Sequence, residues 1–283
     1  SVEELKALVE KAEELNKDDY VASTWDNFAQ ALEAAKAVLD SDDATQAEIE
    51  AAKENLQKAM DALLSKTGWQ VINGQKYYYG EDGTKKTGWQ EIDGKKYYFG
   101  EENDGAMKTY WQQIDGKWYF FGNDGVMRTY WQKIWGKWYF LGNASDGAMK
   151  TGWQKIWGKW YYLGSANDGA MKTGWQQVYG KWYYLGNAED GSMKTYWQQI
   201  NGKWYFFGGA DDGAMKTGWQ KIWGKWYYLG SANDGAMKTG WQKINGKWYY
   251  FGGEQDGSMK SNVWVGDYYL DNSGVWSKTK KSK

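Results

Sequence analysis

Apolar side chains recur at helical spacing in three stretches of the first 65 residues. The stripes consist of Leu5, Leu8, Val9, Ala12 and Leu15, then Trp25, Phe28, Leu32, Ala35, Val38 and Leu39, and finally Ile49, Ala52, Leu56, Ala59, Met60 and Leu63. Ser23 or Thr24 can cap the second helix, and Thr45 with Glu48 has the spacing of a capping box before the third. The pattern predicts a small bundle of three amphipathic helices.

After Lys66 the helical period gives way to a sequence repeat. A Trp-Gln pair returns at steps of 20 or 22 residues, and the 25 residues TGWQKIWGKWYYLGSANDGAMKTGW at 151–175 return unchanged at 217–241. The nine copies start at Trp69, Trp89, Trp111, Trp131, Trp153, Trp175, Trp197, Trp219 and Trp241, and a degraded tenth surrounds Trp264. The sequence therefore predicts a linear array.

Each copy begins with the pattern W-Q-x-[IV]-x-G-x-x-Y, which predicts two short strands joined by a two-residue turn. Asn or Asp precedes the turn glycine in several copies, as a type I′ turn prefers. Because an isolated hairpin is only marginally stable in water, neighbouring hairpins must bury a shared face. A β-solenoid of hairpins is the expected architecture.

The pleat divides the rings of each hairpin between two faces. In the copy that starts at Trp153, a turn at Trp157 and Gly158 pairs Trp153 with Tyr162 and Lys155 with Trp160. One face then holds Trp153, Lys155, Trp160 and Tyr162, and the other holds Gln154, Ile156, Tyr161 and Leu163. We expect the second face to pack and the first to be a ligand face, although aromatic rings also pack well on one another.

The amino-acid composition limits the kinds of catalytic and metal-binding site that the chain can form. Aromatic residues reach 19% and the chain has no His and no Cys, whereas the mean hydropathy is only -0.85. Disulfides, thiol nucleophiles, imidazole bases and His/Cys zinc sites are therefore excluded. We predict no enzyme activity, no catalytic residue, no metal and no cofactor, because the repeats supply only turn aspartates, which Asp-Gly turn chemistry explains better than calcium binding.

The distribution of charge and the length of apolar runs argue against a nucleic-acid-binding protein and a membrane-spanning protein. Residues 1–65 hold 6 Lys against 16 acidic residues, and the remainder holds 29 basic against 20 acidic residues. The basic residues recur with the repeat and form no dense stripe, so we expect no nucleic-acid partner. No apolar run has the length of a membrane helix, and this fragment shows no signal peptide.

The stretch STWDNFAQALEAAKAVLDSDDATQAEIEAAKENLQKAMDAL resembles the FIVAR module, a helical spacer of Gram-positive surface proteins. The block GWQKINGKWYYF, followed by DGSMK or DGAMKTGW, resembles the choline-binding repeats of cell-wall hydrolases and surface adhesins. We therefore expect an α+β multidomain chain, with a three-helix bundle followed by a left-handed β-hairpin solenoid of about nine to ten repeats. The expected domains are 1–65 (FIVAR-like bundle), 66–260 (nine hairpin repeats) and 261–283 (divergent hairpin and basic tail).

The choline-binding resemblance implies sites between consecutive hairpins, built from the first Trp, the Trp seven residues later and an aromatic residue of the following hairpin. The implied binding residues are Trp111, Trp118, Trp131, Trp138, Trp153, Trp160, Tyr162, Trp175, Trp182, Tyr184, Trp197, Trp204, Trp219, Trp226, Tyr228, Trp241, Trp248 and Tyr250. Methionines that the resemblance places beside the ligand are Met149, Met171, Met193, Met215 and Met237. Six Trp pairs precede an ordinary hairpin, and the seventh, Trp241 with Trp248, precedes the divergent one.

Two features depart from this pattern. The first two hairpins carry Lys76 and Lys96 in place of the second Trp, so we expect them to bind poorly. Turn tips are occupied by Trp135, Trp157 and Trp223, although Trp tolerates the positive φ of a type I′ turn badly. Either these turns are of another type or strain is accepted, and an exposed ring there can contribute to binding.

The resemblance implies a non-catalytic attachment module that binds choline or phosphocholine of (lipo)teichoic acid, in a secreted or cell-surface protein of a Gram-positive bacterium. The alternative is a carbohydrate-binding module that stacks glycans on the same rings, with hydrogen bonds from Gln154 and Gln220; the first two hairpins resemble glucan-binding repeats. A third interpretation is a stalk whose rings only pack. Homodimer formation through the terminal repeats stays open.

Overall fold

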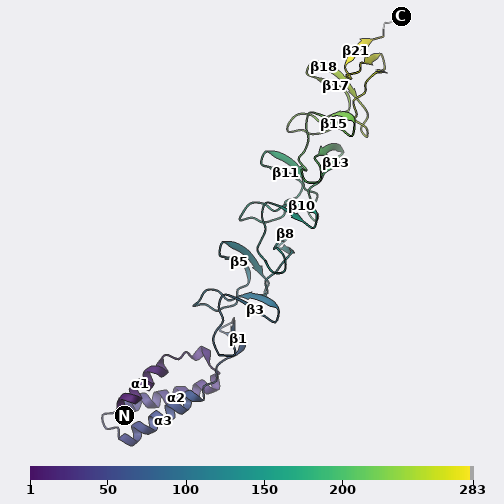
Figure 1. Ribbon diagram of the computed structural model, residues 1–283. Helices are drawn as coiled ribbons and strands as arrows, with labels where there is room; N and C mark the ends of the chain where they lie inside the picture. Colours follow the sequence, from purple (N-terminus) through teal and green to yellow (C-terminus); the bar gives the residue numbers. More distant parts are fainter. Residues whose placement is uncertain (281–283) are drawn as a thin grey trace. The chain divides into compact units, whose positions relative to one another are not determined.

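Three helices form the N-terminal part of the computed structural model, which describes residues 1–280 (Figure 1). They are α1 (Val2–Glu13), α2 (Ala22–Leu39) and α3 (Gln46–Asp61), with a short 3-10 helix, η1 (Lys17–Asp19), after α1. Leu5, Phe28, Ala35 and Leu56 are fully buried between them. The predicted bundle is confirmed, with one predicted stripe contributing to its core from each helix.

The predicted cap of α2 is wrong, and that of α3 is confirmed. The helix α2 begins at Ala22, its N-cap is Val21, and no side chain caps it. Val21 N–H instead donates to the Leu64 carbonyl at 2.8 Å, so a contact distant in sequence fixes where α2 begins. At α3, the Thr45 hydroxyl accepts from the Glu48 N–H at 3.3 Å, and the Thr45 N–H donates to the Glu48 carboxylate at 2.8 Å.

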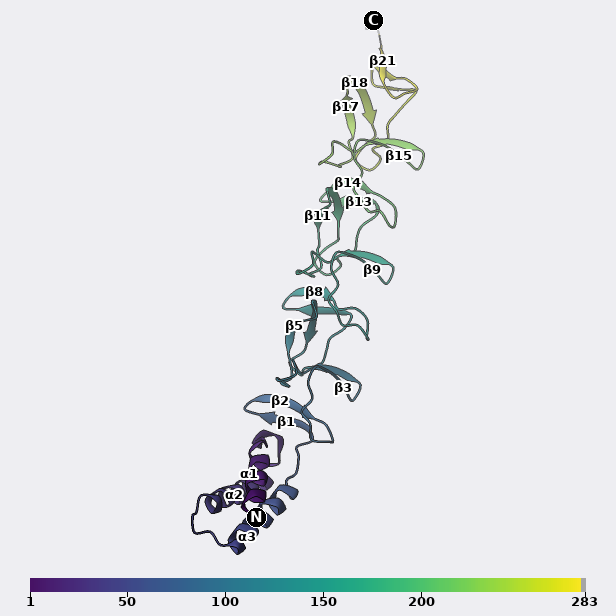
Figure 2. The same ribbon diagram turned by 60° about the vertical axis from the view of Figure 1, so that its left-hand side comes forward.

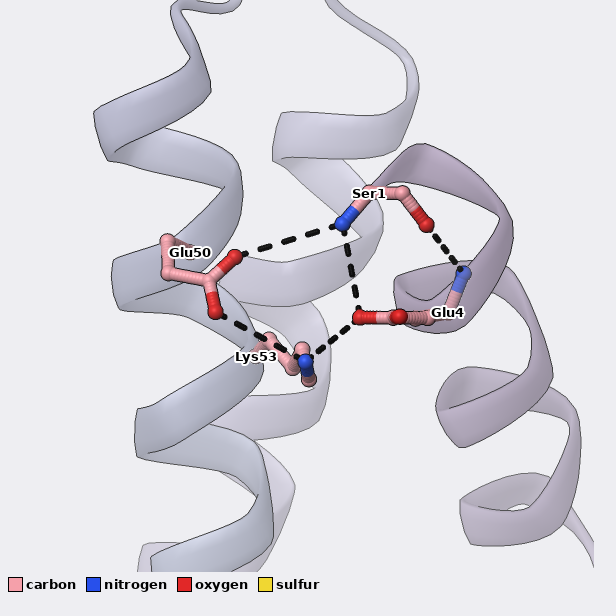
Figure 3. Close-up of polar contacts among 4 residues, drawn as sticks. All are labelled: Ser1, Glu4, Glu50 and Lys53. Carbon is pink, nitrogen blue, oxygen red and sulfur yellow. Dashed lines mark hydrogen bonds and ion pairs between the residues drawn. The ribbon is translucent and has the colours of Figure 1, made fainter.

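Ion pairs join the first and third helices on the bundle surface (Figure 3). The Lys53 ammonium lies 2.6 Å from Glu4 Oε2 and 3.6 Å from Glu50 Oε1. Hydrogen bonding to Lys53 holds the pKa of Glu4 below its usual value. Because these groups are exposed, the pairs add little to a bundle that its apolar core stabilises.

From Gly68 to Thr279 the chain forms a series of β-hairpins joined by loops (Figures 1 and 2). Among the described residues these form nine two-stranded sheets and one three-stranded sheet. The strands are β1 (Gly68–Ile72), β2 (Gln75–Tyr79), β3 (Trp89–Ile92), β4 (Lys95–Tyr98), β5 (Tyr110–Ile114), β6 (Lys117–Phe121), β7 (Trp131–Ile134), β8 (Lys137–Phe140), β9 (Trp153–Ile156), β10 (Lys159–Tyr162), β11 (Trp175–Val178), β12 (Lys181–Tyr184), β13 (Tyr196–Ile200), β14 (Lys203–Phe207), β15 (Trp219–Ile222), β16 (Lys225–Tyr228), β17 (Gly240–Ile244), β18 (Lys247–Phe251), β19 (Val263–Val265), β20 (Tyr268–Leu270) and β21 (Trp276–Thr279). The predicted fold class, a helical module followed by repeated hairpins, is confirmed.

The predicted register is also confirmed. In β9–β10, Trp153 pairs with Tyr162 and Lys155 pairs with Trp160. Trp157 has φ 50° and Gly158 has φ 83°, so both turn residues lie in the left-handed region. The turn therefore has the positive φ values of type I′, and the strain at Trp157 is accepted.

Hairpins are tied to one another through their loops. The Met171 N–H, in the loop after β10, donates to the Trp138 carbonyl in β8 at 2.8 Å. The Met149 side chain fills the space that a Cβ on Gly169 would need, and Gly169 has φ 68°. The Asp-Gly pair thus provides a left-handed turn and room for the methionine of the preceding loop.

The helical module is attached to the first hairpin by hydrogen bonds. The Tyr79 hydroxyl, at the end of β2, lies 3.2 Å from the Asp18 carbonyl and 3.3 Å from an Asp19 carboxylate oxygen. Burial, followed by the charge of Asp19, raises the pKa of Tyr79 to about 12. Lys66 N–H also donates to the Asp19 carbonyl at 3.0 Å.

Contacts along the chain define two compact units, Ser1–Arg128 and Thr129–Lys283. The first unit holds the helices and the hairpins β1–β2, β3–β4 and β5–β6. The predicted domain boundaries near residues 65 and 260 stay predictions. Residues 281–283 of the predicted basic tail lie outside the described residues.

Candidate functional site

A cage of aromatic rings forms where β13–β14 meets β15–β16. The Trp197 and Trp204 rings lie nearly perpendicular, with centroids 6.5 Å apart and an interplanar angle of 81°. Tyr227 of the following hairpin lies edge-on to Trp197 at 4.9 Å. The rings border a cavity of about 280 Å³, lined by Trp197, Trp204, Trp223, Tyr227, Met237, Gln255 and Asp256. The predicted pair of tryptophans is therefore brought together around an open space.

The geometry repeats with little change. The first Trp of a hairpin lies 6.3 to 6.5 Å from the second in the pairs Trp111–Trp118, Trp131–Trp138, Trp175–Trp182 and Trp219–Trp226. A Tyr of the next hairpin lies 4.8 to 4.9 Å from the first Trp in Trp131–Tyr161, Trp153–Tyr183, Trp175–Tyr205 and Trp219–Tyr249. At β15–β16 the rings border a cavity of about 370 Å³, where Met259, Asn272 and Ser273 complete the lining.

The aromatic residue of the following hairpin that the resemblance implies is, in the structure, a tyrosine expected on the packing face. The sequence predicts Tyr161 on the packing face, and in the structure its ring contacts Trp131 of the preceding hairpin. One signal in the sequence marks this position: it is Tyr in all nine copies, whereas the next-but-one neighbour is Leu, Phe or Tyr. The tyrosines that contact the first Trp of the preceding hairpin include Tyr97, Tyr119, Tyr161, Tyr183, Tyr205, Tyr227 and Tyr249.

The tyrosines predicted from the ligand face lie elsewhere around the first Trp. Tyr162, Tyr184, Tyr228 and Tyr250 each contact the first Trp of their own hairpin, with centroids 5.2 to 5.4 Å apart. Tyr228 and Tyr250 are not among the residues that line the cavities at their hairpins. Their position favours support of the indole over contact with a ligand.

The last predicted pair has more rings around it than the sequence indicated. Trp241 and Trp248 border a cavity of about 370 Å³ together with Tyr268 and Trp276. Tyr268 lies 5.5 Å from Trp241, and Trp276 lies 5.1 Å from Tyr268. Trp276 comes from β21, a third strand that the repeat pattern did not predict.

The first two hairpins keep the frame of the cage but lack one wall. Trp69 contacts Tyr97 at 5.0 Å, and the Met107 N–H donates to the Lys76 carbonyl at 2.8 Å, as in the complete cages. The Lys76 side chain is exposed. These hairpins therefore present one indole and one phenol where later hairpins present two indoles and a phenol.

The predicted methionines combine packing with lining. Met149, Met171, Met193, Met215 and Met237 each fill the space beside the Asp-Gly glycine of the next loop. Met237 and Met259 also line cavities. Both interpretations of the methionines are compatible with this placement.

Polar groups differ from cage to cage. The Trp138 indole N–H donates to Glu189 at 3.1 Å, and the Trp160 indole N–H donates to Asp211 at 2.8 Å. Hydrogen bonds from Lys133 and then Trp138 lower the pKa of Glu189, and bonds from Trp160 and then Lys155 lower that of Asp211. At Trp182 the acceptor is neutral, Asn233 at 3.3 Å.

Trp204 differs from these three. Its indole nitrogen is buried and has no hydrogen-bond partner among the described residues. A buried indole N–H is normally paired. The Trp204 residue lines the cavity at β13–β14.

The glutamines that follow each first Trp are occupied within their own hairpins. Gln154 Nε2 donates to the Thr151 carbonyl at 2.9 Å, and Gln220 Nε2 donates to the Thr217 carbonyl at 2.9 Å. The same bond is present in all nine copies. One amide N–H of each of these glutamines therefore braces the strand entry.

Acidic groups of the repeat serve the turns. Asp212 accepts from Lys216 at 2.7 Å, and Asp256 accepts from Lys260 at 2.5 Å. No group of three or more His, Cys, Asp or Glu residues suited to a metal ion occurs within residues 1–280. In the same described region, none of the helices is long and apolar enough to cross a membrane.

The chain matches known repeats along most of its length. The family model described as "Choline-binding repeat" matches residues 66–111, 108–151, 150–196, 194–239 and 216–264, and the FIVAR domain model matches residues 1–64. Choline binding protein F from Streptococcus pneumoniae is 34% identical with a TM-score of 0.55, over 76% of this chain and 93% of that chain. CbpJ from the same species is 30% identical with a TM-score of 0.56, over 76% of this chain and 94% of that chain.

A curated relative matches over a shorter stretch. HylA of Enterococcus faecalis, a polysaccharide lyase 8 family protein, is 37% identical over 62 residues, which is 22% of this chain and 4% of HylA. The chain thus spans a small fraction of that protein's length.

Proposed function

Since the chain belongs to the choline-binding repeat family, we propose that it is a non-catalytic module that attaches a protein to choline groups of teichoic acid on a bacterial surface. The observation that carries this proposal is the repeated cage of two perpendicular indoles and a phenol around an open cavity, as at Trp197, Trp204 and Tyr227. We expect the parent protein to be secreted or held at the cell surface.

The cage suits a quaternary ammonium ion. Such an ion cannot donate a hydrogen bond, and it is attracted instead by the negative faces of aromatic rings. Each desolvated cation–π contact contributes about 1 to 2 kcal/mol, so a three-walled site has an affinity of roughly millimolar strength. Hydrogen bonds from protein donors are not needed.

The binding residues that we propose follow the geometry of the complete cages. The first and second tryptophans form two walls, and the tyrosine of the next hairpin forms the third. The proposed sites centre on Trp111 with Trp118, Trp131 with Trp138, Trp153 with Trp160, Trp175 with Trp182, Trp197 with Trp204, Trp219 with Trp226, and Trp241 with Trp248. The last site uses Tyr268 and Trp276 in place of a repeat tyrosine.

A solved relative supports this ligand class. Choline binding protein F has been solved in complex with ipratropium and in the presence of a peptidoglycan analogue. Ipratropium, like choline, contains a quaternary ammonium group. Catalysis by this chain is not part of the proposal, because its turn aspartates are engaged with lysines of the same loops.

A fluorescence titration tests the proposal. Intrinsic tryptophan emission is followed with choline chloride, with ammonium chloride at equal ionic strength, and with a neutral glucose oligosaccharide. We expect saturation at millimolar choline and no saturable response to ammonium. A response to the oligosaccharide with none to choline would support the carbohydrate-binding alternative, and silence to all three would support the stalk.

A further inference from the structure

Three aromatic substitutions occur together in this array. Where a hairpin has Tyr before its first Trp, it also has Phe nine residues after that Trp, and the next hairpin has Trp at its turn tip. The sets are Tyr110, Phe120 and Trp135, then Tyr130, Phe140 and Trp157, and finally Tyr196, Phe206 and Trp223. The other six hairpins have Gly before the first Trp and Tyr nine residues after it, and none is followed by a Trp tip.

The structure explains why two of these sets vary together. Trp157 lies 6.3 Å from Tyr130 at 36° and 6.4 Å from Phe140 at 87°. In the second set, Trp223 lies 6.2 Å from Tyr196 at 39° and 6.1 Å from Phe206 at 90°. We call each group of three rings, Tyr130–Phe140–Trp157 and Tyr196–Phe206–Trp223, a tip cluster.

The tip clusters are held in unfavourable backbone conformations. Trp157 and Trp223 have φ 50°, and Tyr130 and Tyr196 have φ 59° and 58°. The corresponding positions elsewhere are mostly Asn, Asp or Gly, which tolerate this region at lower cost. Strain of this kind persists where the surrounding structure or the function requires it.

Burial does not compensate for the strain. Trp157 and Trp223 are each 75% exposed, and Tyr130 and Tyr196 are 41% and 44% exposed. A core residue would be covered, whereas these rings form a surface that water contacts. A contiguous group of exposed apolar rings, unlike a single exposed ring, marks a candidate binding surface.

The surface continues from the cage. Phe206 lies 5.2 Å from Trp197, and Trp223 lines the same cavity as Trp197, Trp204 and Tyr227. Gln255, whose side-chain amide can donate and accept hydrogen bonds, lines the same cavity. The site thus combines a cage, an adjoining exposed ring and the amide of Gln255.

We propose that each tip cluster binds the sugar ring to which a choline phosphate is attached, while the neighbouring cage binds the trimethylammonium group. The proposal rests on the proposed function. The apolar C–H face of a hexose packs on an exposed indole, and the oxygens of the linked phosphate or sugar accept from a donor at the cavity such as the Gln255 amide. Cages without a tip cluster bind the choline group alone.

Calorimetry with graded ligands tests the proposal. The probes are choline chloride, phosphocholine, a methyl hexoside 6-phosphocholine and the methyl hexoside alone. The wild-type chain should bind the hexoside phosphocholine in two classes of site. The affinity of the tighter class for this probe should be at least several-fold higher than its affinity for phosphocholine. The variant Trp157→Asn should lose one equivalent of the tighter class and keep its affinity for choline, because Trp157, unlike Trp223, lines none of the three cavities described above.

The choice of Asn keeps this test interpretable. Asn occupies the same turn position at Asn201 and Asn245 and tolerates positive φ, so the variant should melt no lower than the wild type. Tyr179→Asn is the matched control, because Tyr179 is an 89% exposed tip that follows a hairpin with Gly152 and Tyr162. This control should change neither class.

A gain of function provides the reverse test. Gly218→Tyr, Tyr228→Phe and Asn245→Trp together rebuild a tip cluster beside the cage of Trp219 and Trp226, and should add one equivalent of the tighter class. Equal affinities of the wild type for phosphocholine and its hexoside would overturn the proposal. A loss of choline binding in the Asn variant as large as its loss of hexoside phosphocholine binding would also overturn the proposal. Tight binding of the methyl hexoside alone would do the same. Failure of the wild type to bind choline at all would instead overturn the proposed function.

Discussion

Single side chains decide whether a hairpin forms a complete cage. Trp69 and Tyr97 at the start of the array are placed as Trp219 and Tyr249 are placed near its end, and the difference between them is Lys76 against Trp226. The first two hairpins are therefore internal controls for the proposed site.

Removal of one wall should remove one site. We expect Trp160→Ala to lower the number of bound choline molecules by one in equilibrium dialysis, because Tyr183 and Trp153 alone cannot surround the cation. Lys76→Ala should leave the number unchanged. Equal losses in the two variants would contradict the site assignment.

The converse substitution should create a site. In Lys76→Trp, a second indole would stand opposite Trp69 and Tyr97, on a backbone already held by the Met107 N–H. We expect one additional choline equivalent with millimolar affinity. An unchanged number, with the melting temperature retained, would show that two indoles and a phenol are not sufficient.

Tyr79 connects the helices to the first hairpin by its hydroxyl. Tyr79→Phe leaves the ring in place and removes the donor to Asp18 and Asp19, so we expect a loss of about 1 kcal/mol in the free energy of unfolding. Urea unfolding followed by the helical circular dichroism signal measures it. Tyr77→Phe is the control, since the Tyr77 hydroxyl bonds only to exposed Gln75. Equal effects would argue against a specific role for Tyr79.

At the scale of the element, the sequence predicts the pairing within a hairpin well and the contacts between hairpins poorly. The Trp157–Gly158 turn and the alternation of side chains were sufficient for the register, because both are local. The resemblance implies an aromatic third wall from the following hairpin, but the pleat of one hairpin does not identify which tyrosine supplies it, because that depends on the rotation from one hairpin to the next. For the same reason the cap of α2 was wrong, since Leu64 fixes it from a distance.

The turn ion pairs should make the hairpins sensitive to acid. Hydrogen bonds from Lys216 and Lys260 hold the pKa values of Asp212 and Asp256 below the ordinary value. A lowered pKa in the folded state stabilises the fold above the unfolded value of about 3.9, and this contribution is lost as the pH falls through the lowered value. We therefore expect the melting temperature to fall between about pH 4 and pH 2.

A variant separates these pairs from general charge repulsion. Lys216→Met, Lys238→Met and Lys260→Met together remove three of the ammonium partners, so the acid-induced fall in melting temperature should be smaller than in the wild type. An identical fall in both proteins would mean that the turn pairs do not contribute.

At the scale of the whole molecule, the proposed sites act as a set. Weak sites on one chain hold a polymer with repeated choline groups far more tightly than a single site does. Affinity for the polymer should therefore depend steeply on the number of cages, whereas affinity for free choline should not.

Loss of several cages tests this dependence. We expect Trp160→Ala, Trp182→Ala and Trp204→Ala together to weaken retention on a choline-substituted polymer by more than about tenfold. The affinity of the remaining sites for free choline should stay unchanged in a titration. A loss of retention only in proportion to the number of sites would contradict cooperation along the chain.

One cage draws on three successive repeats. Trp131 and Trp138 belong to one repeat, and Tyr161, which contacts Trp131, belongs to the next repeat. Glu189, which accepts a hydrogen bond from the Trp138 indole, belongs to the repeat after that. Duplication of a single repeat in the gene would therefore change which loop lies against an existing cage. Duplication of three repeats would copy a cage together with the loop that contacts it. The identical segments 151–175 and 217–241 lie three repeats apart, as do Trp157 and Trp223. Identity between repeats that lie three apart is the pattern expected of a gene that lengthened by duplication of three repeats at a time.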